Sequence, residues 1–210
     1  ALADMARLKR APDVYALGFA LGPRINAAGR VGHADLALEL LTTHDKIRAQ
    51  QLAQELEALN RHRQDVEMRV VDAALLQAEQ ALGKERLAPV IVVAGEGWHP
   101  GVVGLAASRL KDRYRRPAFV LGIDRAAGHA TGSGRSIHGA DLGAAVRRAM
   151  SGGLLAKGGG HAMAAGLTVE IDKLSALRAF LEAELAAGVD LASPTILEID
   201  GALSAGGATL

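Results

Sequence analysis

The fold is organised around one long stretch, residues 44–82, which reads HDKIRAQQLAQELEALNRHRQDVEMRVVDAALLQAEQAL. It contains neither glycine nor proline, and Gly83 follows it as a residue type that commonly ends helices. Apolar residues recur at spacings of four and three, which predicts an amphipathic helix, about 58 Å long at roughly 1.5 Å per residue. The apolar seam comprises Leu52, Leu56, Leu59, Val66, Val70 and Ala73, and it is interrupted by Arg63 and Gln77. We expect this helix to link two domains and to pack on both, with a coiled-coil arm as the alternative.

The residues before this stretch predict two short helices, 2–9 and 33–41, separated by a loop. Residues 18–33 are loop-like because Gly22-Pro23 and Gly29 are breakers of regular structure. The chain begins with Ala1 rather than Met, and helix-compatible sequence starts at once. We therefore expect the chain to be a piece of a longer protein.

After Gly83 the pattern changes to alternating strands and helices. The predicted strands are 89–94, 117–123, 129–136 and 165–170, and the predicted helices are 100–113, 139–150 and 172–187, with Asp172 as the N-cap of the last. This order predicts an α/β domain with a mixed sheet. Ser193-Pro194 then breaks the chain, and 195–199 could be the first strand of a further unit.

The composition describes a globular chain with little overall charge. Half of the 210 residues are apolar, 22% are charged, and the formal net charge is +1. A diffuse electrostatic affinity for nucleic acid is therefore not implied, and any such site must be local. The absence of cysteine excludes disulfides and thiolate metal sites. No apolar run approaches the roughly 18 residues that span a bilayer, so we expect no membrane partner and a cytoplasmic location.

Four glycine-rich segments carry the candidate functional residues: 21–30, 95–101, 131–136 and 157–166. Glycines let a backbone approach a ligand closely, and arginine presents a rigid fork of donors to phosphate oxygens. An aromatic ring beside a helix start could stack on a base while free N–H groups of that helix receive an anion. The candidate binding residues are Arg24, Asn26, Arg30, Trp98, His99, Ser133, Arg135, Ser136, Gly159, Gly160 and His161.

Each segment also has a purely structural interpretation. The arginines of 21–30 could pair with surface carboxylates, Trp98 could be a core residue, 131–136 could be a glycine-rich hairpin edge, and His161 could be a hydrogen-bonded structural histidine. Four segments of this type within one chain nevertheless favour a phosphate-rich ligand. The sequence has no P-loop, HExxH or GxSxG motif and no histidine and carboxylate set with convincing metal-ligand spacing. We therefore expect no catalytic or metal-binding residue in this section.

These segments resemble, in order, the signatures of the RecJ branch of the DHH/DHHA1 phosphoesterase superfamily. GPRINAAGR at 22–30 is similar to the motif that ends the catalytic DHH domain. GEGWHPGVVG at 95–104, followed by ASRL at 107–110, is similar to the opening of the DHHA1 domain. GSGRS at 132–136 and GGHAMAAG at 159–166 resemble its two substrate-binding motifs. The resemblance covers residues 17–187.

The resemblance implies a mixed-sheet DHHA1-type α/β domain preceded by a long connecting helix and by the end of a DHH domain. The implied divisions are 1–43 for the DHH remnant, 44–83 for the helix, 84–190 for the DHHA1 domain, and 191–210 for a linker and the possible start of an OB-fold domain. The chain contains no Asp-His-His triplet, so the implied Mn²⁺ or Mg²⁺ ions would be held upstream of Ala1.

The implied activity is 5′→3′ exonuclease action on single-stranded DNA in repair and recombination, with this section binding and positioning the DNA phosphate. Single-stranded DNA is the expected partner, and a single-strand-binding protein is a further one. We expect Arg24, Arg135 and His161 to converge on one terminal phosphate. The alternatives are a related phosphoesterase acting on short oligonucleotides or nucleotides, and a non-catalytic nucleic-acid-binding module.

Overall fold

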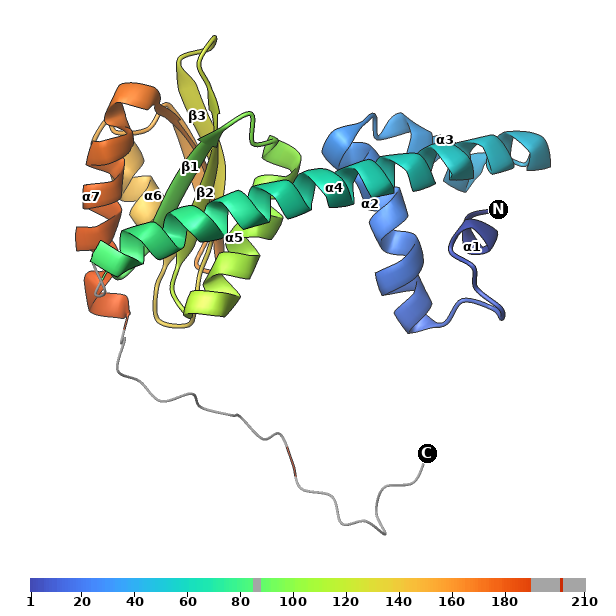
Figure 1. Cartoon of the computed structure of the whole chain (residues 1–210), viewed down its shortest axis with the longest axis horizontal. Coiled ribbons are helices and arrows are strands. Elements are labelled where there is room, and N and C mark those ends of the chain that lie inside the picture. The colour runs from blue at the N-terminus through green and yellow to red at the C-terminus, as the bar shows by residue number, and fades with distance from the viewer. Residues whose placement is uncertain (85–87, 190–200, 202–210) are drawn as a thin grey trace.

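A computed structural model describes residues 1–84, 88–189 and 201 of the chain. It forms two lobes along one continuous helix, α4 (Lys46–Lys84) (Figure 1). The N-terminal lobe contains α1 (Leu2–Met5), a π-helical turn (Ala16–Leu21), α2 (Gly22–Val31) and α3 (Asp35–Thr42). The second lobe contains β1 (Ile91–Glu96), α5 (Pro100–Tyr114), β2 (Ala118–Asp124), β3 (His129–Arg135), α6 (Leu142–Ser151), β4 (Lys157–His161), β5 (Ala164–Glu170) and α7 (Leu174–Leu185).

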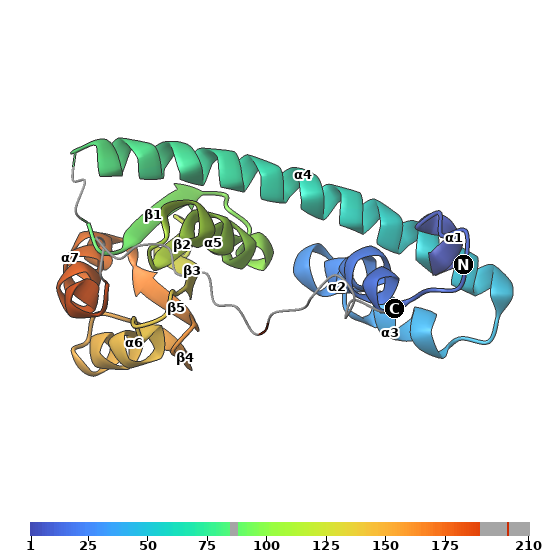
Figure 2. The ribbon, with the colours of Figure 1, turned by 90° about the horizontal axis from the view of Figure 1, so that it is seen from below.

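The second lobe is a three-layer sandwich around a five-stranded sheet of order β1-β2-β3-β5-β4. Strands β1 and β2 are parallel and joined by α5, whereas the other pairs are antiparallel. Figure 2 shows α6 and α7 on the side of the sheet that faces away from α2 and α3. The predicted α/β class with a mixed sheet is therefore confirmed.

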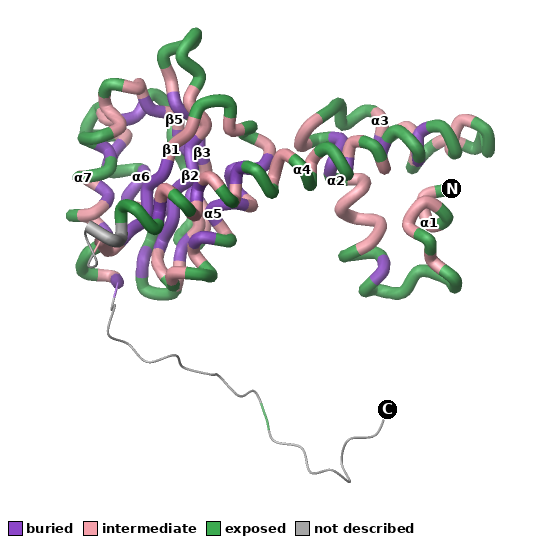
Figure 3. The backbone as a smooth tube through the Cα atoms, viewed as in Figure 1, coloured by how far each residue is buried: buried purple, intermediate pink, exposed green. Residues whose placement is uncertain are grey.

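Two apolar cores lie on the two faces of this sheet (Figure 3). One core packs α6 and α7 against the sheet and includes Phe119 and Val146, while the other packs α4 and α5 against it and includes Val70 and Leu110. The second of these cores takes its strand residues from β1 and β2. The face of β5 and β4 that points away from α6 therefore has no helix packed on it among the described residues.

Helix α4 contributes to a core in each lobe, as predicted, but its buried face drifts. Leu52 and Leu56 are fully buried near the start, while Val70, Ala74 and Ala78 are buried near the end. The predicted seam instead contained Ala73, which is only half-buried. A helix has 3.6 residues per turn, so a strict four-three repeat rotates by about 20° per heptad. Toward the end of α4 the buried position has therefore shifted by one residue, from Ala73 to Ala74.

The predicted loop at 18–33 is wrong, because these residues are helical. The π-helical turn runs directly into α2, which begins at Gly22 and carries Pro23 in its first turn. The first turn of a helix makes no use of a backbone N–H, so proline is tolerated there. Ala27 and Ala28 are fully buried, and their burial outweighs the weak helix propensity of the glycines.

Other local expectations are corrected in the same way. The first helix ends at Met5 rather than at residue 9. Asp172 does not cap the last helix: it lies in a 3₁₀ turn (Ile171–Lys173), and α7 begins after Lys173 without a side-chain cap hydrogen bond. Strand β4 was not predicted as a strand. The predicted strand at 195–199 lies outside the described residues. No helix in the described ranges contains a stretch long and apolar enough to cross a membrane.

We predict that Leu56→Asp destabilises the chain, because it places a charge in the core that α4 shares with Ala28 and Ala37. The expected loss is about 3–5 kcal/mol, typical of an uncompensated buried charge. Leu76→Asp is the matched control, since Leu76 lies on the same helix and is 57% exposed. Thermal and urea unfolding of both variants measures the difference, and equal midpoints would contradict the packing described here.

Candidate nucleic-acid interface

Three rows of residues cross strands β3, β5 and β4 on one face of the sheet, which α5 borders at β3 and which no described helix covers at β5 and β4. Residues paired between neighbouring strands project to the same face of a sheet, so the register places distant sequence segments side by side. The rows are Thr131–Thr168–Lys157, Ser133–Gly166–Gly159 and Arg135–Ala164–His161. We call these nine residues the shelf. It unites the third and fourth glycine-rich segments of the sequence.

The middle row of the shelf is almost bare backbone. Gly166 and Gly159 carry no side chains, both are exposed, and a Cβ atom at Gly159 would meet nothing within 4 Å. On one side of this strip lies the row ending in exposed His161, and on the other the row ending in exposed Lys157. A ligand can therefore approach the backbone closely and meet cationic or donor side chains on either side.

Glycine occupies the three consecutive positions 158–160 of β4 for different physical reasons. Gly158 faces α6, because a Cβ atom there would lie 2.7 Å from Val146, whereas a Cβ atom at Gly160 would lie 2.4 Å from the carbonyl oxygen of Ala164 in β5. The φ angle of Gly160 is also positive, at 153°. Gly159 alone points to the open face. Gly158 therefore lets β4 lie close to α6, Gly160 lets it lie close to β5, and Gly159 leaves the shelf flat.

Arg135 is held at the edge of the shelf beside α5. Its Nη1 donates to the carbonyl oxygen of Gly134 at 2.9 Å. A Cβ atom at Gly104 of α5 would lie 3.0 Å from Nη2 of Arg135 and 3.5 Å from Oγ of Ser133. Glycine at position 104 therefore leaves room for both side chains. Within the described ranges no carboxylate pairs with Arg135, so its guanidinium charge is available to an anion.

The second glycine-rich segment has mainly structural contacts. Trp98 lies over two glycines, since a Cβ atom would come within 2.2 Å of its ring at Gly95 and 2.0 Å of its carbonyl oxygen at Gly122. His99 is the N-cap of α5, and its Nδ1 accepts the N–H of Gly101 at 3.0 Å. The carbonyl oxygen of His99 accepts the N–H of Val102 at 3.0 Å. The expectation of free N–H groups at this helix start is therefore wrong.

Residues of the first segment join α2 to its neighbours. Nη1 of Arg30 donates to the carbonyl oxygen of Gly101 at 3.1 Å, which links the N-terminal lobe to α5. Nε of Arg24 pairs with Glu57 of α4 at 2.6 Å, and its Nη1 donates to the carbonyl oxygen of Ala20 at 2.7 Å. These contacts support the structural interpretation of both arginines. Asn26 is exposed on α2.

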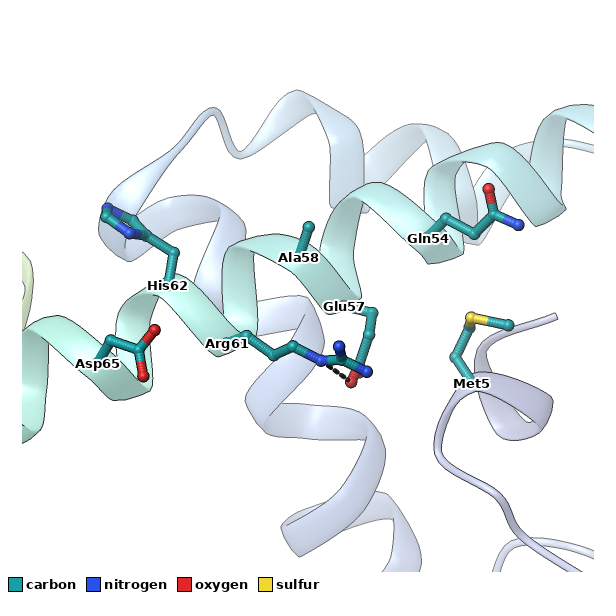
Figure 4. A pocket seen from close by; sticks show the side chains of 7 residues that line it. All are labelled: Met5, Gln54, Glu57, Ala58, Arg61, His62 and Asp65. Carbon is teal, nitrogen blue, oxygen red and sulfur yellow. Dashed lines mark hydrogen bonds and ion pairs between the residues drawn. The ribbon is translucent and has the colours of Figure 1, made fainter.

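Glu57 also borders a hollow of about 430 Å³ on the outer side of α4 (Figure 4). There its other oxygen accepts from Arg61 at 3.0 Å. The pair with Arg24 is the more buried of the two, because the Arg24 side chain is 17% exposed and the Arg61 side chain 71%. Arg24 is thus fixed in the N-terminal lobe, while Arg135 and His161 share one row of the shelf.

Ser136 lies just beyond the shelf and is buried, at 1% exposure. Its Oγ donates to the carbonyl oxygen of Ala140 at 2.6 Å, so it stabilises the turn before α6. The sequence interpretation missed Thr168 and Gly104 as parts of the interface. The alternation of small and apolar residues along β5 could have identified Thr168, whereas only the packing of α5 identifies Gly104.

No group of three or more His, Cys, Asp or Glu residues within the described part of the chain is arranged to hold a metal ion. The described residues therefore do not fit a catalytic metal centre. The chemistry that the shelf can supply is binding and orientation of a phosphate-bearing strand.

The chain is similar to known proteins in sequence and in fold. The family model for the DHHA1 domain matches residues 87–187. The chain is 42% identical over 184 residues to the single-stranded-DNA-specific exonuclease RecJ of Bacillus subtilis, an alignment that covers 88% of this chain and 22% of that protein. It is also 42% identical over 162 residues to the RecJ protein of Escherichia coli, covering 75% of this chain and 28% of that one.

Solved structures show the same relationship. The crystal structure of RecJ in complex with Mn²⁺ from Thermus thermophilus superposes with a TM-score of 0.76 at 35% identity, covering 89% of this chain and 26% of that chain. A structure of exonuclease RecJ bound to manganese gives a TM-score of 0.73 at 34% identity, over 90% of this chain and 47% of that one. The chain thus spans only 22% and 28% of the two curated relatives described above.

We predict that Arg24→Ala destabilises the chain by about 1.5–3 kcal/mol, the usual range for a hydrogen bond to a charged group. Arg61→Ala is the control at the same carboxylate, and an exposed pair of this kind contributes at most about 1 kcal/mol. Urea unfolding of the two variants measures both losses. A small loss for Arg24→Ala, combined with weakened binding of single-stranded DNA, would instead make Arg24 a ligand contact.

Proposed function

We propose that this chain, which carries a DHHA1 domain and belongs to the RecJ family, binds the 5′ end of single-stranded DNA on the shelf and positions it for hydrolysis. The observation that carries this proposal is the register of β3, β5 and β4. It brings Ser133 and Arg135, at the edge of α5, into the same rows as Gly159 and His161, which lie where no described helix covers the sheet.

The chemistry of the shelf suits a terminal phosphate. Arg135 and His161 flank Ala164 in one row, and neighbouring strands are about 4.8 Å apart. The methyl group of Ala164 is short, so the two longer side chains can both reach a phosphate held above it. Arginine provides a charge-assisted, two-pronged contact, and histidine adds a further donor. Ser133 contributes a hydroxyl in the adjacent row.

The shelf also suits a strand rather than a duplex. The bare strip at Gly166 and Gly159 lets a sugar-phosphate backbone lie against the protein backbone. With a formal net charge of only +1, the chain as a whole exerts little diffuse attraction on DNA, so its contacts with phosphates must be local. The direction in which the DNA strand lies on the shelf would then be set by the end that carries the phosphate bound by Arg135.

For the whole protein we propose a metal-dependent 5′→3′ exonuclease specific for single-stranded DNA that acts in repair and recombination. The support for single-strand specificity and metal dependence is the 42% sequence identity to proteins named single-stranded-DNA-specific exonucleases and the Mn²⁺ in a solved relative. The 5′→3′ direction and the role in repair and recombination rest on the family resemblance alone. The described residues form no metal site, so the share of this chain is substrate positioning. A single-strand-binding protein as partner and a cytoplasmic location stay predictions.

We predict that Arg135→Ala in the full-length protein slows degradation of 5′-phosphorylated single-stranded DNA by roughly 10- to 150-fold, which corresponds to about 1.5–3 kcal/mol of lost charge-assisted contact. The loss should be smaller on a 5′-hydroxyl strand, which offers less charge to the guanidinium. Single-turnover rates on the two strands measure the difference.

The matched control for this variant is Arg113→Ala, which removes an exposed arginine of α5 that pairs with Glu79 at 2.9 Å. It should change neither rate. Equal losses on both strands for Arg135→Ala would assign the residue to an internal phosphate or to folding, and unfolding of the variant by heat separates those two outcomes.

A second prediction concerns the chain of 210 residues by itself. Because its described residues form no metal site, it should release no nucleotide from a 5′-labelled single strand in the presence of Mn²⁺ or Mg²⁺, even where it binds that strand. Gel analysis of purified protein, with the full-length protein as the positive control, measures this. Metal-dependent degradation by the chain alone would show that it contains a catalytic centre.

A further inference from the structure

A hollow of about 560 Å³ opens where the parallel strands β1 and β2 end. Its volume lies in the usual range of small-ligand sites, roughly 300–1,000 Å³. Ligands of open α/β sheets commonly bind outside the carboxyl ends of parallel strands. Residues of three chain segments line it, among them Trp98, His99, Gly122, Asp124, His129 and Thr131. Of these, Gly122, Asp124 and His129 belong to none of the segments predicted from the sequence.

One row of paired residues runs across the sheet from the hollow to the shelf. The register pairs Gly95 with Gly122, Gly122 with Thr131, Thr131 with Thr168, and Thr168 with Lys157. Trp98 covers the first two positions of this row, and the shelf begins at the third. Thr131 lines the hollow, and its Oγ1 lies 3.1 Å from that of Thr168. Thr131 therefore borders both the shelf and the hollow.

The aromatic wall of the hollow is fixed in place. Glycine at positions 95 and 122 allows Trp98 to lie directly on the sheet, and its ring also packs against the core between α4, α5 and the sheet. The ring is nevertheless only half-buried. A rigid, partly exposed indole is a surface on which a flat ring can stack.

The polar groups around this wall favour a neutral ring over a phosphate. The start of α5 offers no free N–H there, because His99 accepts those of Gly101 and Val102. Nδ1 of His129 donates to the carbonyl oxygen of Ala127 at 2.5 Å, which leaves Nε2 as an acceptor. Arg125 at the rim is paired with Glu96, and this pair holds the pKa of Glu96 below its ordinary value. The hollow thus presents an aromatic face for stacking and polar groups for hydrogen bonds. The arginine at its rim, Arg125, is already paired with Glu96.

We propose that this hollow binds a nucleobase of the single strand whose terminal phosphate lies on the shelf, with the base stacked on Trp98 and its edge hydrogen-bonded to His129 and Thr131. This inference rests on the proposed function, since the shelf must first hold the strand. Stacking on an aromatic ring accepts every base, so the site adds affinity with little sequence preference.

Trp98 is the only tryptophan of the chain, so its fluorescence reports on this hollow directly. The experiment titrates the 210-residue chain with three probes: a 5′-phosphorylated oligothymidylate, an abasic strand of equal length and charge, and thymidine monophosphate. Anisotropy of a 3′-label on each strand measures binding independently. We expect the oligothymidylate to bind and quench Trp98, and the abasic strand to bind more weakly without quenching.

The variant His129→Ala keeps the reporter and removes one base contact. It should weaken binding of the oligothymidylate by about 2- to 12-fold, the range for one lost hydrogen bond, and leave binding of the abasic strand unchanged. His138→Ala, at an exposed histidine that does not line the hollow, is the control.

Each outcome of the titration decides between the two proposals. Binding of both strands without quenching, or equal quenching by the abasic strand, would overturn the base site and leave the shelf intact. Failure of both strands to bind, with no quenching by thymidine monophosphate, would overturn the proposed function and the base site together. Saturable quenching by thymidine monophosphate alone would keep the base site but assign it to a released nucleotide.

Discussion

The arrangement of the whole molecule depends on burial of one continuous face of α4. Leu52 and Leu56 fill the core of the N-terminal lobe, and Val70, Ala74 and Ala78 fill the core between α4, α5 and the sheet. A single helix that serves two cores fixes their spacing, because no hinge residue interrupts it. Because both cores share α4, unfolding of one lobe would remove packing that stabilises this helix, on which the other lobe also packs.

The middle of α4 is the polar stretch between these cores. Arg63 pairs with Glu67 one turn on, and its Nη2 donates to Oδ1 of Asn60 at 3.1 Å. Arg63 thus interrupts the apolar seam between the two cores. The lobes also touch directly, because Arg30 of α2 donates to the carbonyl oxygen of Gly101 at the start of α5 and Val31 packs against the core between α4, α5 and the sheet. Helix α4 and the contact between α2 and α5 thus orient the shelf relative to the N-terminal lobe.

Close packing of glycines shapes the interface itself. Gly104 leaves room for the side chains of Arg135 and Ser133 beneath α5, and Gly158 of β4 and Gly143 of α6 allow these two elements to lie close together. The result is a strand whose rear is tightly packed and whose front is bare. Substitution at the rear would act on folding, whereas substitution at Gly159, which faces open space, would act on the ligand.

The sequence by itself determined the elements whose signal is local. The glycine- and proline-free run at 44–82 predicted α4, the β-branched run before Gly95 predicted β1, and the ordered glycine-rich motifs predicted the family. Only the tertiary structure decided that 22–31 is helical and that 157–161 is a strand. Both are glycine-rich, so their conformation comes from burial of Ala27 and Ala28 on α4 in one case and from pairing with β5 in the other. Which motif residues meet follows from strand register, a long-range property that local patterns do not encode: Arg135 and His161 share a row, whereas Arg24 is paired with Glu57.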